Sequence, residues 1–283
     1  MTLDQGRRKI IGEMEGIYEA EEARNIAAML IEYVTKLPRL ETIVRRDEKL
    51  SSSQEGHLGE FISRLQNHEP VQYITHEAWF AGMKFYVDKN VLIPRPETEE
   101  LVDWIVKDWK AKNSSAKILD VGTGSGCIAI ALKKQLAGAE IWACDLSDDA
   151  ISIARMNADS MQAAIDFVGL DFLDEKQRKQ LPHFDIIVSN PPYIPKEERQ
   201  ELKRNVVDYE PWNALFAPGE DPITFYRSIA GFGKDRLNRG GNIYVEIHRD
   251  FAVEVKRVFL SMGYRSVEIR KDLQGNDRML RIA

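Results

Sequence analysis

Cysteine is scarce in this 283-residue chain, which contains only Cys127 and Cys144. Both lie inside apolar runs without metal-ligand spacing, which excludes a disulfide-rich secreted fold and predicts reduced core thiols and no bound metal. No apolar run is long enough to cross a membrane. The first residues, MTLDQGRRKI, lack the apolar segment of a signal peptide. We therefore expect a cytoplasmic protein that does not associate with membranes.

An excess of positive charge is also absent. The chain has 39 Lys and Arg against 45 Asp and Glu, a net charge of −6 and a pI near 5.6. A protein that covers a long stretch of duplex DNA usually has a basic face and a basic total, so we expect no direct nucleic-acid partner. A local basic run within residues 196–204 is interleaved with glutamates and is interpreted as a solvated helix face. The same run could also contact a partner that is itself bound to RNA.

Length and apolar content indicate the domain organisation. With 43% hydrophobic and 30% charged residues, the chain can form one large domain and one small one. Apolar residues recur at helix spacing between residues 2 and 65, and Ser51-Ser52-Ser53 is placed to cap the later part of this pattern. The alternating segment from Trp79 to Ile93 predicts a hairpin that turns at Asp88-Lys89-Asn90. The expected parts are a helical domain, a β-hairpin linker and a main domain, at residues 1–75, 76–96 and 97–283.

In the main domain, predicted strands alternate with predicted helices. An amphipathic helix is expected at 98–110, and short runs of aliphatic and β-branched residues follow it. These runs lie near residues 117–121, 140–145, 165–170, 184–189 and 241–247. Such alternation is typical of an α/β fold with a mostly parallel, Rossmann-like sheet and helices on both faces.

The first of these strands ends in a glycine turn, Gly122-Thr123-Gly124-Ser125-Gly126, and a predicted helix follows. Glycines let the backbone approach a ligand closely, and free N–H groups at a helix amino terminus suit a carboxylate or phosphate. The spacing fails the dinucleotide pattern, because Cys127 occupies the position of its last glycine or alanine. Asp145 ends the next strand, where a carboxylate can bind both ribose hydroxyls. Taken alone, Asp145 would be interpreted as a solvated turn residue or as the cap of the helix that starts near Asp148, but the glycine turn upstream favours the ribose role.

A second motif, Asn190-Pro191-Pro192-Tyr193, follows the buried strand near 184–189. Proline donates no hydrogen bond, so carbonyl groups at the strand's carboxyl end stay free beside an amide side chain and an aromatic ring. Ligands bind at that end of the strands in open α/β sheets. Carbonyl oxygens can accept both protons of a planar –NH2 group while the ring packs on its face. The alternative is a proline-rich loop that only ends a core strand.

Together these motifs resemble those of S-adenosylmethionine-dependent methyltransferases that act on amide or exocyclic amino nitrogens. From about Pro70 onward the chain resembles one family closely, the HemK-like glutamine methyltransferases that modify class-I peptide chain release factors. The segments that carry this resemblance are PVQYI from residue 70, IPRPETE from 93, the glycine turn within 118–131, SNPPYI from 189, Glu210-Pro211 with Ala214-Leu215, and DLQGNDR from 272. The first seventy residues match only in type, as a small helical domain.

The resemblance implies a seven-stranded methyltransferase sheet whose last strands, near 264–271 and 278–282, form an antiparallel pair. It implies that the helical domain recognises the substrate, and that S-adenosylmethionine is the cofactor. The implied cofactor-binding residues are Gly122, Thr123, Gly124, Ser125, Gly126, Asp145, Asp171, Phe172 and Asn190. The family often has Trp at the Phe172 position, and relatives usually carry a glycine within Asp221-Pro222.

Catalysis and substrate binding are implied for the Asn190-Pro191-Pro192-Tyr193 segment. The Asn190 side-chain oxygen and the Pro191 carbonyl would accept the two protons of the substrate amide, while Tyr193 would pack on its plane and Pro192 would stiffen the loop. Arg95 and Glu97 either close over a ligand or belong to a salt-bridged linker. The roles of Glu246 and His248, at the end of a predicted strand, stay open, with His248 expected to be structural.

The sequence thus predicts methyl transfer to the N5 nitrogen of the glutamine in the GGQ motif of class-I release factors, by a monomer. One alternative is a glutamine methyltransferase for a ribosomal protein, which would share most of these motifs. A second is a nucleic-acid adenine N6-methyltransferase, since an exocyclic amine presents the same –NH2 geometry, but it would need a basic target-recognition region. A third is a non-catalytic adaptor, which would have no need of both intact motifs.

Overall fold

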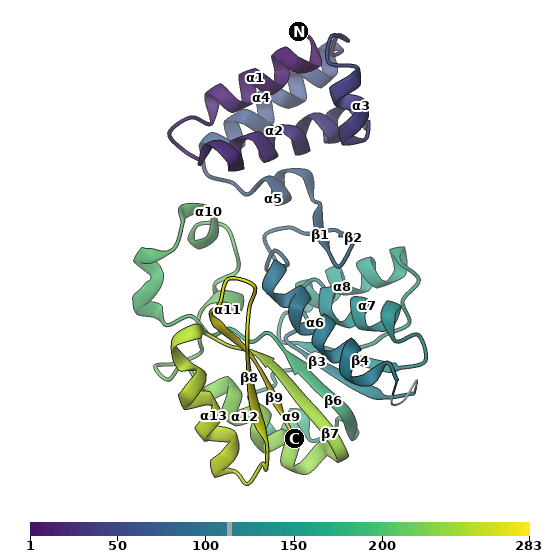
Figure 1. Ribbon diagram of the computed structural model, residues 1–283, viewed down its shortest axis with the longest axis vertical. Coiled ribbons are helices and arrows are strands. Elements are labelled where there is room, and N and C mark those ends of the chain that lie inside the picture. The colour runs from purple at the N-terminus through teal and green to yellow at the C-terminus, as the bar shows by residue number, and fades with distance from the viewer. Residues whose placement is uncertain (112–114) are drawn as a thin grey trace. The chain divides into compact units, whose positions relative to one another are not determined.

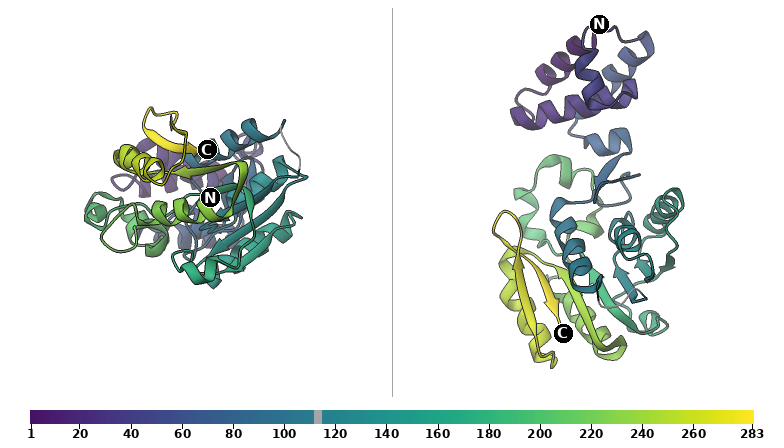
Figure 2. Two further views of the ribbon diagram at one scale, coloured as in Figure 1. Left: turned by 90° about the horizontal axis from the view of Figure 1, so that it is seen from below. Right: turned by 45° about the vertical axis from the view of Figure 1, so that its right-hand side comes forward.

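The computed structural model describes residues 1–111 and 115–283, which form two compact units (Figure 1, Figure 2). Unit 1 consists of Met1–Glu77 together with Lys203–Tyr209. Unit 2 consists of Ala78–Leu202 together with Glu210–Ala283. The sequence pattern does not predict that a short segment from beyond residue 200 belongs to the first unit.

Unit 1 is helical. Its helices are α1 (Leu3–Glu13), α2 (Ala20–Thr35), α3 (Arg39–Val44), α4 (Ser52–Gln66), α5 (Val71–Thr75) and α10 (Arg204–Val207). Apolar residues two turns apart, such as Leu58 and Leu65 of α4, are buried in one core. The hydroxyl of Ser51 accepts the N–H of Gln54 at 3.3 Å, and the Gln54 side chain accepts the N–H of Ser51 at 2.8 Å. This capping box confirms the predicted cap.

The Lys203–Tyr209 segment is bonded to the helices of unit 1. Lys203 forms an ion pair with Glu22 at 3.3 Å, and the Tyr209 hydroxyl donates to the carbonyl of Asn67 at 2.7 Å. The Lys203 side chain is nevertheless 70% exposed. An exposed pair of this kind contributes at most about 1 kcal/mol. The exposure agrees with the interpretation of this basic run as a solvated surface.

The hairpin at the start of unit 2 lies earlier in the chain than predicted. β1 (Ala78–Phe80) pairs antiparallel with β2 (Met83–Phe85) through a turn at Ala81 and Gly82, whose φ angles are 49° and 73°. Asp88-Lys89-Asn90 does form a turn, but within the described residues 86–95 no strand flanks it. The side chain of Asn157 bonds the N–H and the carbonyl of Tyr86, at 2.8 and 3.0 Å. An amide side chain therefore takes the place of the expected strand partner.

The main sheet has seven strands in the order β5-β4-β3-β6-β7-β9-β8. They are β3 (Lys117–Val121), β4 (Glu140–Asp145), β5 (Asp166–Gly169), β6 (Phe184–Ser189), β7 (Leu237–Glu246), β8 (Val267–Lys271) and β9 (Asp277–Ile282). The first five run parallel, and β9 pairs antiparallel with both β7 and β8. The predicted mostly parallel sheet and its antiparallel final pair are confirmed. The order reverses between β3 and β6, which is where open α/β sheets bind ligands.

Helices cover both faces of this sheet (Figure 1). On one face lie α6 (Pro96–Trp109), α7 (Cys127–Gln135) and α8 (Asp148–Ser160), and on the other α12 (Thr224–Arg236) and α13 (Ala252–Ser261). Neighbouring residues of β3 enter opposite cores, Ile118 on the α6 side and Leu119 on the α12 side. Burial on both faces explains why the strands read as continuous apolar runs. Shorter helices in the loops are α9 (Glu175–Arg178), α11 (Trp212–Leu215), η1 (Lys196–Glu201) and η2 (Arg249–Phe251).

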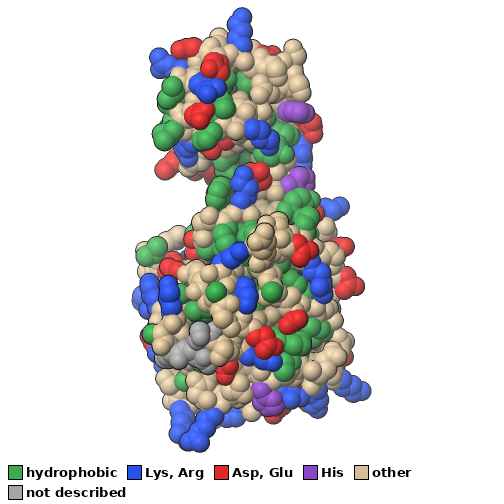
Figure 3. Space-filling model, turned by 90° about the vertical axis from the view of Figure 1, so that its right-hand side faces the viewer, with side chains coloured by type: hydrophobic (Ala, Val, Ile, Leu, Met, Phe, Trp, Pro, Cys, Tyr) green, Lys and Arg blue, Asp and Glu red, His purple; other side chains and the backbone are tan. Residues whose placement is uncertain are grey.

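Charge is mixed on the surface drawn in Figure 3. Lys and Arg side chains are interspersed there with Asp and Glu and with apolar side chains. In the part of the chain that the structure describes, no helix is long and apolar enough to cross a membrane. Within the same residues, no group of three or more His, Cys, Asp and Glu side chains is placed to hold a metal ion.

Candidate active site

The glycine turn after β3 has all three glycines in the left-handed region, with φ angles of 73°, 53° and 81° at Gly122, Gly124 and Gly126. The Gly122 N–H donates to the carbonyl of Cys144 on β4 at 2.9 Å. A Cβ on Gly122 or Gly124 would meet no atom within 4 Å. One on Gly126 would lie 3.2 Å from the Cβ of Ala154. The first two glycines therefore border open space, and the third is needed for packing against α8.

The two residues between the glycines are buried, with Thr123 4% and Ser125 2% exposed. The Thr123 hydroxyl donates to Asp120 Oδ2 at 2.7 Å. Burial raises the pKa of Asp120 to about 7, although the hydrogen bonds from Thr123 and from the N–H of Ala129 oppose this. Asp120 Oδ1 has no hydrogen-bond partner in the described residues. The Thr123 hydroxyl thus supports the turn from within, whereas Ser125 Oγ has no hydrogen-bond partner among the residues that the structure describes. Because both side chains are buried, ligand contacts of these two residues would come from their backbone.

Asp145 ends β4 with its carboxylate directed at the glycine turn. Oδ2 accepts the N–H of Gly124 at 2.9 Å, and Oδ1 accepts the N–H of Ser147 at 3.0 Å. Burial raises the pKa of this carboxyl, and the two backbone hydrogen bonds counteract the shift. Ser147 itself caps α8 by accepting the N–H of Ala150, so the helix-cap alternative for Asp145 is wrong. Each oxygen of Asp145 keeps lone pairs for further donors, such as the hydroxyls of a ribose.

A cavity of about 270 Å³ lies at the carboxyl ends of β3, β4 and β6. The predicted site residues that line it are Gly122, Gly124, Asp145, Asp171, Phe172, Asn190 and Pro192. Most of its remaining wall is apolar and includes Val91, Leu92, Leu146, Trp212, Phe216 and Phe225. Predicted site residues outside the lining are Thr123, Ser125, Gly126, Pro191 and Tyr193. An apolar wall with a few convergent polar groups is typical of a small-molecule site.

The Asn190-Pro191-Pro192-Tyr193 segment is connected to two residues that the sequence analysis did not assign. Asn190 Nδ2 donates to Thr98 Oγ1 at 3.0 Å, and Thr98 Oγ1 donates to Glu246 Oε2 at 2.6 Å. The Tyr193 hydroxyl donates to Glu246 Oε1 at 3.0 Å. Asn190 Oδ1 makes no hydrogen bond within residues 1–111 and 115–283. The segment is therefore held at both ends by one carboxylate, and an amide oxygen is left free.

Glu246 is 1% exposed at the end of β7. Burial raises the pKa of its carboxyl, while hydrogen bonds from Thr98 and Tyr193 and the charge of Arg278 lower it. The backbone carbonyl of Glu246 also accepts the hydroxyl of Tyr226 at 3.0 Å. The residue is thus fixed through both its side chain and its main chain.

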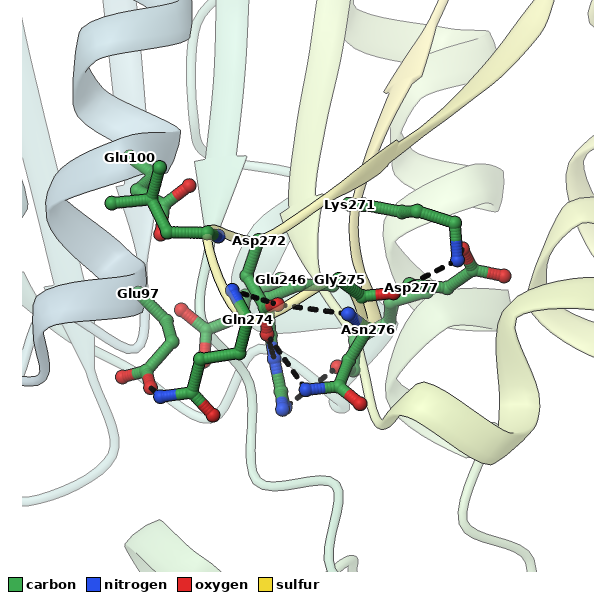
Figure 4. Close-up of polar contacts among 12 residues, drawn as sticks. Glu97, Glu100, Glu246, Lys271, Asp272, Gln274, Gly275, Asn276 and Asp277 are labelled. Carbon is green, nitrogen blue, oxygen red and sulfur yellow. Dashed lines mark hydrogen bonds and ion pairs between the residues drawn. The ribbon is translucent and has the colours of Figure 1, made fainter.

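The β8–β9 turn carries the DLQGNDR segment, and its Arg278 is the cation that acts on Glu246. Asp272 accepts the N–H groups of Gln274 and Asn276, at 3.0 and 2.9 Å, and the Nε–H of Arg278 at 3.3 Å. Figure 4 shows Glu246 beside this turn, with the Gln274 side chain directed at Glu97. Asp272 therefore shapes the turn and orients the cation whose charge stabilises the buried Glu246 carboxylate.

Phe172 and Asp171 follow β5, as predicted for an adenine contact. Phe172 is 4% exposed, and its ring lies parallel to that of Phe225 with centroids 6.1 Å apart. The Asp171 carboxylate accepts the N–H of Leu173 at 2.9 Å. Because Phe172 is almost fully buried and packs beside Phe225 and Phe232, the geometry favours a contact through the cavity wall over a stack on the ring. The role of both residues in binding adenine stays a prediction.

The other charged candidates have structural partners. Arg95 forms an ion pair with Glu210 at 2.5 Å, and Glu210 also accepts the N–H of Ile93 at 3.1 Å. His248 Nε2 lies 3.2 Å from a carboxylate oxygen of Glu198. These contacts favour the salt-bridged linker for Arg95 and a structural role for His248.

Comparison with known proteins adds the family. A model of the PrmC N-terminal domain matches residues 16–75, and a model of the methyltransferase small domain matches residues 99–212. A release factor glutamine methyltransferase of Flavobacterium psychrophilum is 38% identical and aligns with 100% of this chain and 99% of its own. Another, from Bacteroides thetaiotaomicron, is 41% identical over 94% of this chain and 95% of its own. This chain belongs to the release factor glutamine methyltransferase family.

The fold agrees with this membership. A solved methyltransferase structure from Pyrococcus furiosus superposes with a TM-score of 0.53 over 82% of this chain and 98% of its own, at 16% identity. An identity so low shows the fold alone. The curated relatives and the two family models, matched in chain order, confirm the resemblance noted in the sequence.

The sequence motifs of this family member predicted much of the cavity lining. They did not predict Thr98 or the role of Glu246, two residues that lie behind the lining. Thr98 lies inside the IPRPETE segment, whose charged residues Arg95 and Glu97 are the more evident candidates for binding a ligand. Glu246 ends a strand adjacent to β6, and the carboxyl ends of adjacent parallel strands lie together. A signal was therefore present at Glu246, but which side chains would meet depends on the packing of α6 above the sheet.

Proposed function

We propose that this chain transfers a methyl group from S-adenosylmethionine to the N5 amide nitrogen of the glutamine in the GGQ motif of class-I peptide chain release factors. The observation that carries the proposal is the cavity that joins Asn190 to the glycine turn and Asp145. Relatives that align with nearly the whole chain carry the name release factor glutamine methyltransferase.

The residues present fit this cofactor. Gly122 and Gly124 leave open the space that a Cβ would fill, and Asp145 adds a carboxylate with spare acceptor capacity. We assign the methionine end to the glycine turn, the ribose to Asp145, and the adenine to the wall that includes Asp171 and Phe172. When bound, the cofactor supplies a methyl group that is already activated by the positive sulfur.

The protein's task is then to make a poor nucleophile react. The lone pair of a carboxamide nitrogen is delocalised, and its protons are too weakly acidic for a side chain to remove. We assign Asn190 Oδ1 and the Pro191 carbonyl as acceptors of the two amide protons, which raises electron density on the nitrogen. Attack of this nitrogen on the methyl carbon would break the sulfur–carbon bond of the cofactor, and one amide proton would leave to water. Holding the nitrogen in line with the bond that breaks would supply much of the acceleration of methyl transfer.

Tyr193 and Pro192 complete the slot for the amide. Burial raises the pKa of the Tyr193 hydroxyl, so it stays protonated and donates to Glu246. Tyr193 is therefore assigned to packing against the amide plane and not to proton removal. Pro192 lines the cavity and restricts the backbone next to the reacting groups.

For unit 1 we propose recognition of the release factor, by a monomeric enzyme in the cytoplasm. A ribosomal-protein glutamine offers the same –NH2 group to the slot and is the second candidate substrate. Adenine N6 methylation is disfavoured because it calls for a basic surface, whereas the net charge is −6. The basic run at 196–204 is interleaved with glutamates.

The test is transfer of label from methyl-tritiated S-adenosylmethionine to a purified class-I release factor. A GGA version of the factor, a ribosomal-protein fraction and duplex DNA are incubated in parallel. Label on the GGQ factor alone supports the proposal. Label on the ribosomal fraction alone supports the second candidate, and label on DNA or on the GGA version contradicts both readings of the slot.

A further inference from the structure

We infer that Thr98 and Glu246 are positioning residues that determine which way the Asn190 side-chain amide points. The inference rests on the proposed function, because it assigns the free Asn190 oxygen to the substrate amide. Neither residue lines the cavity, and both are buried, with Thr98 2% and Glu246 1% exposed. They act on the reaction only through the orientation of Asn190.

The argument starts from the polarity of the hydrogen bonds. An ionised carboxylate can only accept, so the 2.6 Å contact between Thr98 Oγ1 and Glu246 Oε2 uses the hydroxyl proton of Thr98. With its one proton committed, Thr98 Oγ1 can only accept from its remaining neighbour. That neighbour is the Asn190 amide at 3.0 Å, which must therefore turn its NH2 group toward Thr98. Asn190 Oδ1 therefore points away from Thr98 and stays free to accept a hydrogen bond.

This polarity matches what the reaction needs. The substrate glutamine presents an NH2 group, and Asn190 can bind it only with an oxygen. In the flipped orientation, two NH2 groups would face each other and the acceptor for the substrate proton would be lost. An asparagine amide is nearly symmetric in shape, so packing alone selects poorly between the two orientations. The carboxylate of Glu246, acting through one hydroxyl, supplies the missing selection.

Burial raises the pKa of the Glu246 carboxyl, and the hydrogen bonds from Thr98 and Tyr193 counteract this shift and use the carboxyl as an acceptor. Its second oxygen accepts the Tyr193 hydroxyl at 3.0 Å, so both oxygens face donors. Arg278 on the neighbouring turn adds a positive charge that favours ionised Glu246, and Glu97 opposes it. One carboxylate therefore holds Asn190 indirectly and Tyr193 directly, which sets the spacing of the two residues on either side of the prolines.

The first experiment compares Thr98→Val with Thr98→Ser. Valine keeps the shape and removes the hydroxyl, whereas serine keeps the hydroxyl and removes a methyl group. We expect Thr98→Val to lower kcat at least about tenfold with KM for the release factor and cofactor affinity changed less than about threefold. Thr98→Ser should retain kcat within about threefold of the parent enzyme. Equal losses in both variants, or unchanged kcat in Thr98→Val, would overturn the inference.

A second experiment measures the polarity without activity. Asn190→Asp places an acceptor beside Thr98 Oγ1, whose proton is committed to Glu246. Adding Glu246→Gln supplies an amide that can donate to Thr98, which releases the hydroxyl proton toward residue 190. If the two changes were independent, their shifts in melting temperature would add. We expect the melting temperature of the double variant to lie at least about 2 °C above this additive value.

The same cycle in a Thr98→Val background separates the hydrogen-bond chain from simple charge repulsion. There the coupling should largely disappear, because no hydroxyl connects the two positions. Undiminished coupling would mean that the two carboxylates act through space, and an additive cycle with Thr98 present would mean no coupling at all; either result overturns the inference. The melting data decide the matter even if the parent enzyme transfers no methyl group to a release factor, in which case the proposed function alone fails.

Discussion

Replacing Asp145 by Asn should weaken cofactor binding strongly while the fold persists. The carboxylate accepts one backbone N–H on each oxygen, from Gly124 at 2.9 Å and from Ser147 at 3.0 Å. An amide of the same shape must turn its NH2 group toward one of these two donors. One backbone donor then loses its partner, at a cost of about 1–3 kcal/mol. The charge that strengthens hydrogen bonds from ribose hydroxyls is lost as well.

The lost backbone partner lowers the stability of the free and bound protein alike, whereas the loss of the charged hydrogen bonds to the ribose, about 1.5–3 kcal/mol, raises the dissociation constant roughly 10- to 150-fold. Isothermal titration calorimetry with S-adenosylmethionine measures it directly. Asp149→Asn, an exposed acidic residue in the first turn of α8, is the matched control and should leave the affinity unchanged.

A cofactor product that lacks the ribose 2′-hydroxyl sharpens the test. S-adenosylhomocysteine and its 2′-deoxy analogue should differ in affinity for the parent protein and bind alike to Asp145→Asn. The assignment of the ribose to Asp145 is refuted if Asp145→Asn binds the cofactor as tightly as the parent. It is refuted equally if the 2′-hydroxyl matters as much in the variant as in the parent.

Three further outcomes follow from the packing and charge of unit 2. Gly126→Ala should lower the melting temperature more than Gly122→Ala. Both variants place alanine in the left-handed region, at a cost of roughly 1–2 kcal/mol, but only Gly126→Ala brings a Cβ within 3.2 Å of Ala154. Equal decreases in melting temperature would contradict this packing argument. The pKa of Asp120 is raised from 3.8 to about 7, so its stabilising protonation is complete below pH 3.8 and lost as the pH rises through about 7. The asparagine of Asp120→Asn does not titrate, so the unfolding free energy of this variant should rise relative to that of the parent between pH 3.8 and about 7, as measured by denaturant titration. A difference that stays constant with pH would contradict the raised pKa of Asp120. Arg95→Ala should destabilise the fold by roughly 2 kcal/mol or more, because buried Glu210 loses its cation, without weakening cofactor binding; calorimetry showing the reverse would return Arg95 to the ligand site.

Regular elements of the sheet were predictable because their signals are local. Lys117–Val121 and Phe184–Ser189 are short aliphatic runs between loops, and they form the central strands β3 and β6. The capping box at Ser51 is likewise written within four neighbouring residues.

The hairpin was predicted at the wrong residues because its turn contains an alanine with a positive φ angle. Ala81 adopts a φ of 49°, which glycine or asparagine would normally occupy, so the sequence gives weak notice of a turn there. The segment after β2 alternates like a strand, yet the side chain of Asn157, distant in sequence, satisfies the backbone of Tyr86. Local alternation cannot reveal a partner that arrives through tertiary packing.

The candidate site divides in the same way. Its motif residues could be predicted because glycines, prolines and the ends of apolar strands are visible in the sequence. Thr98 and Glu246 do not, because their role depends on a hydrogen-bond chain between α6, β6 and β7. Residues that orient other residues carry no signature of their own, and only the three-dimensional arrangement identifies them.

Mass spectrometry of the release factor gives the most direct test of glutamine methylation by this protein. A class-I release factor is incubated with S-adenosylmethionine and either the parent protein or Asn190→Ala, and the peptide that contains GGQ is then fragmented. We predict one added methyl group on the glutamine side chain with the parent protein, and none with Asn190→Ala although that variant still binds the cofactor. An unmodified GGQ peptide with active, cofactor-bound parent protein, or a methyl group elsewhere in the factor, would contradict the proposed function.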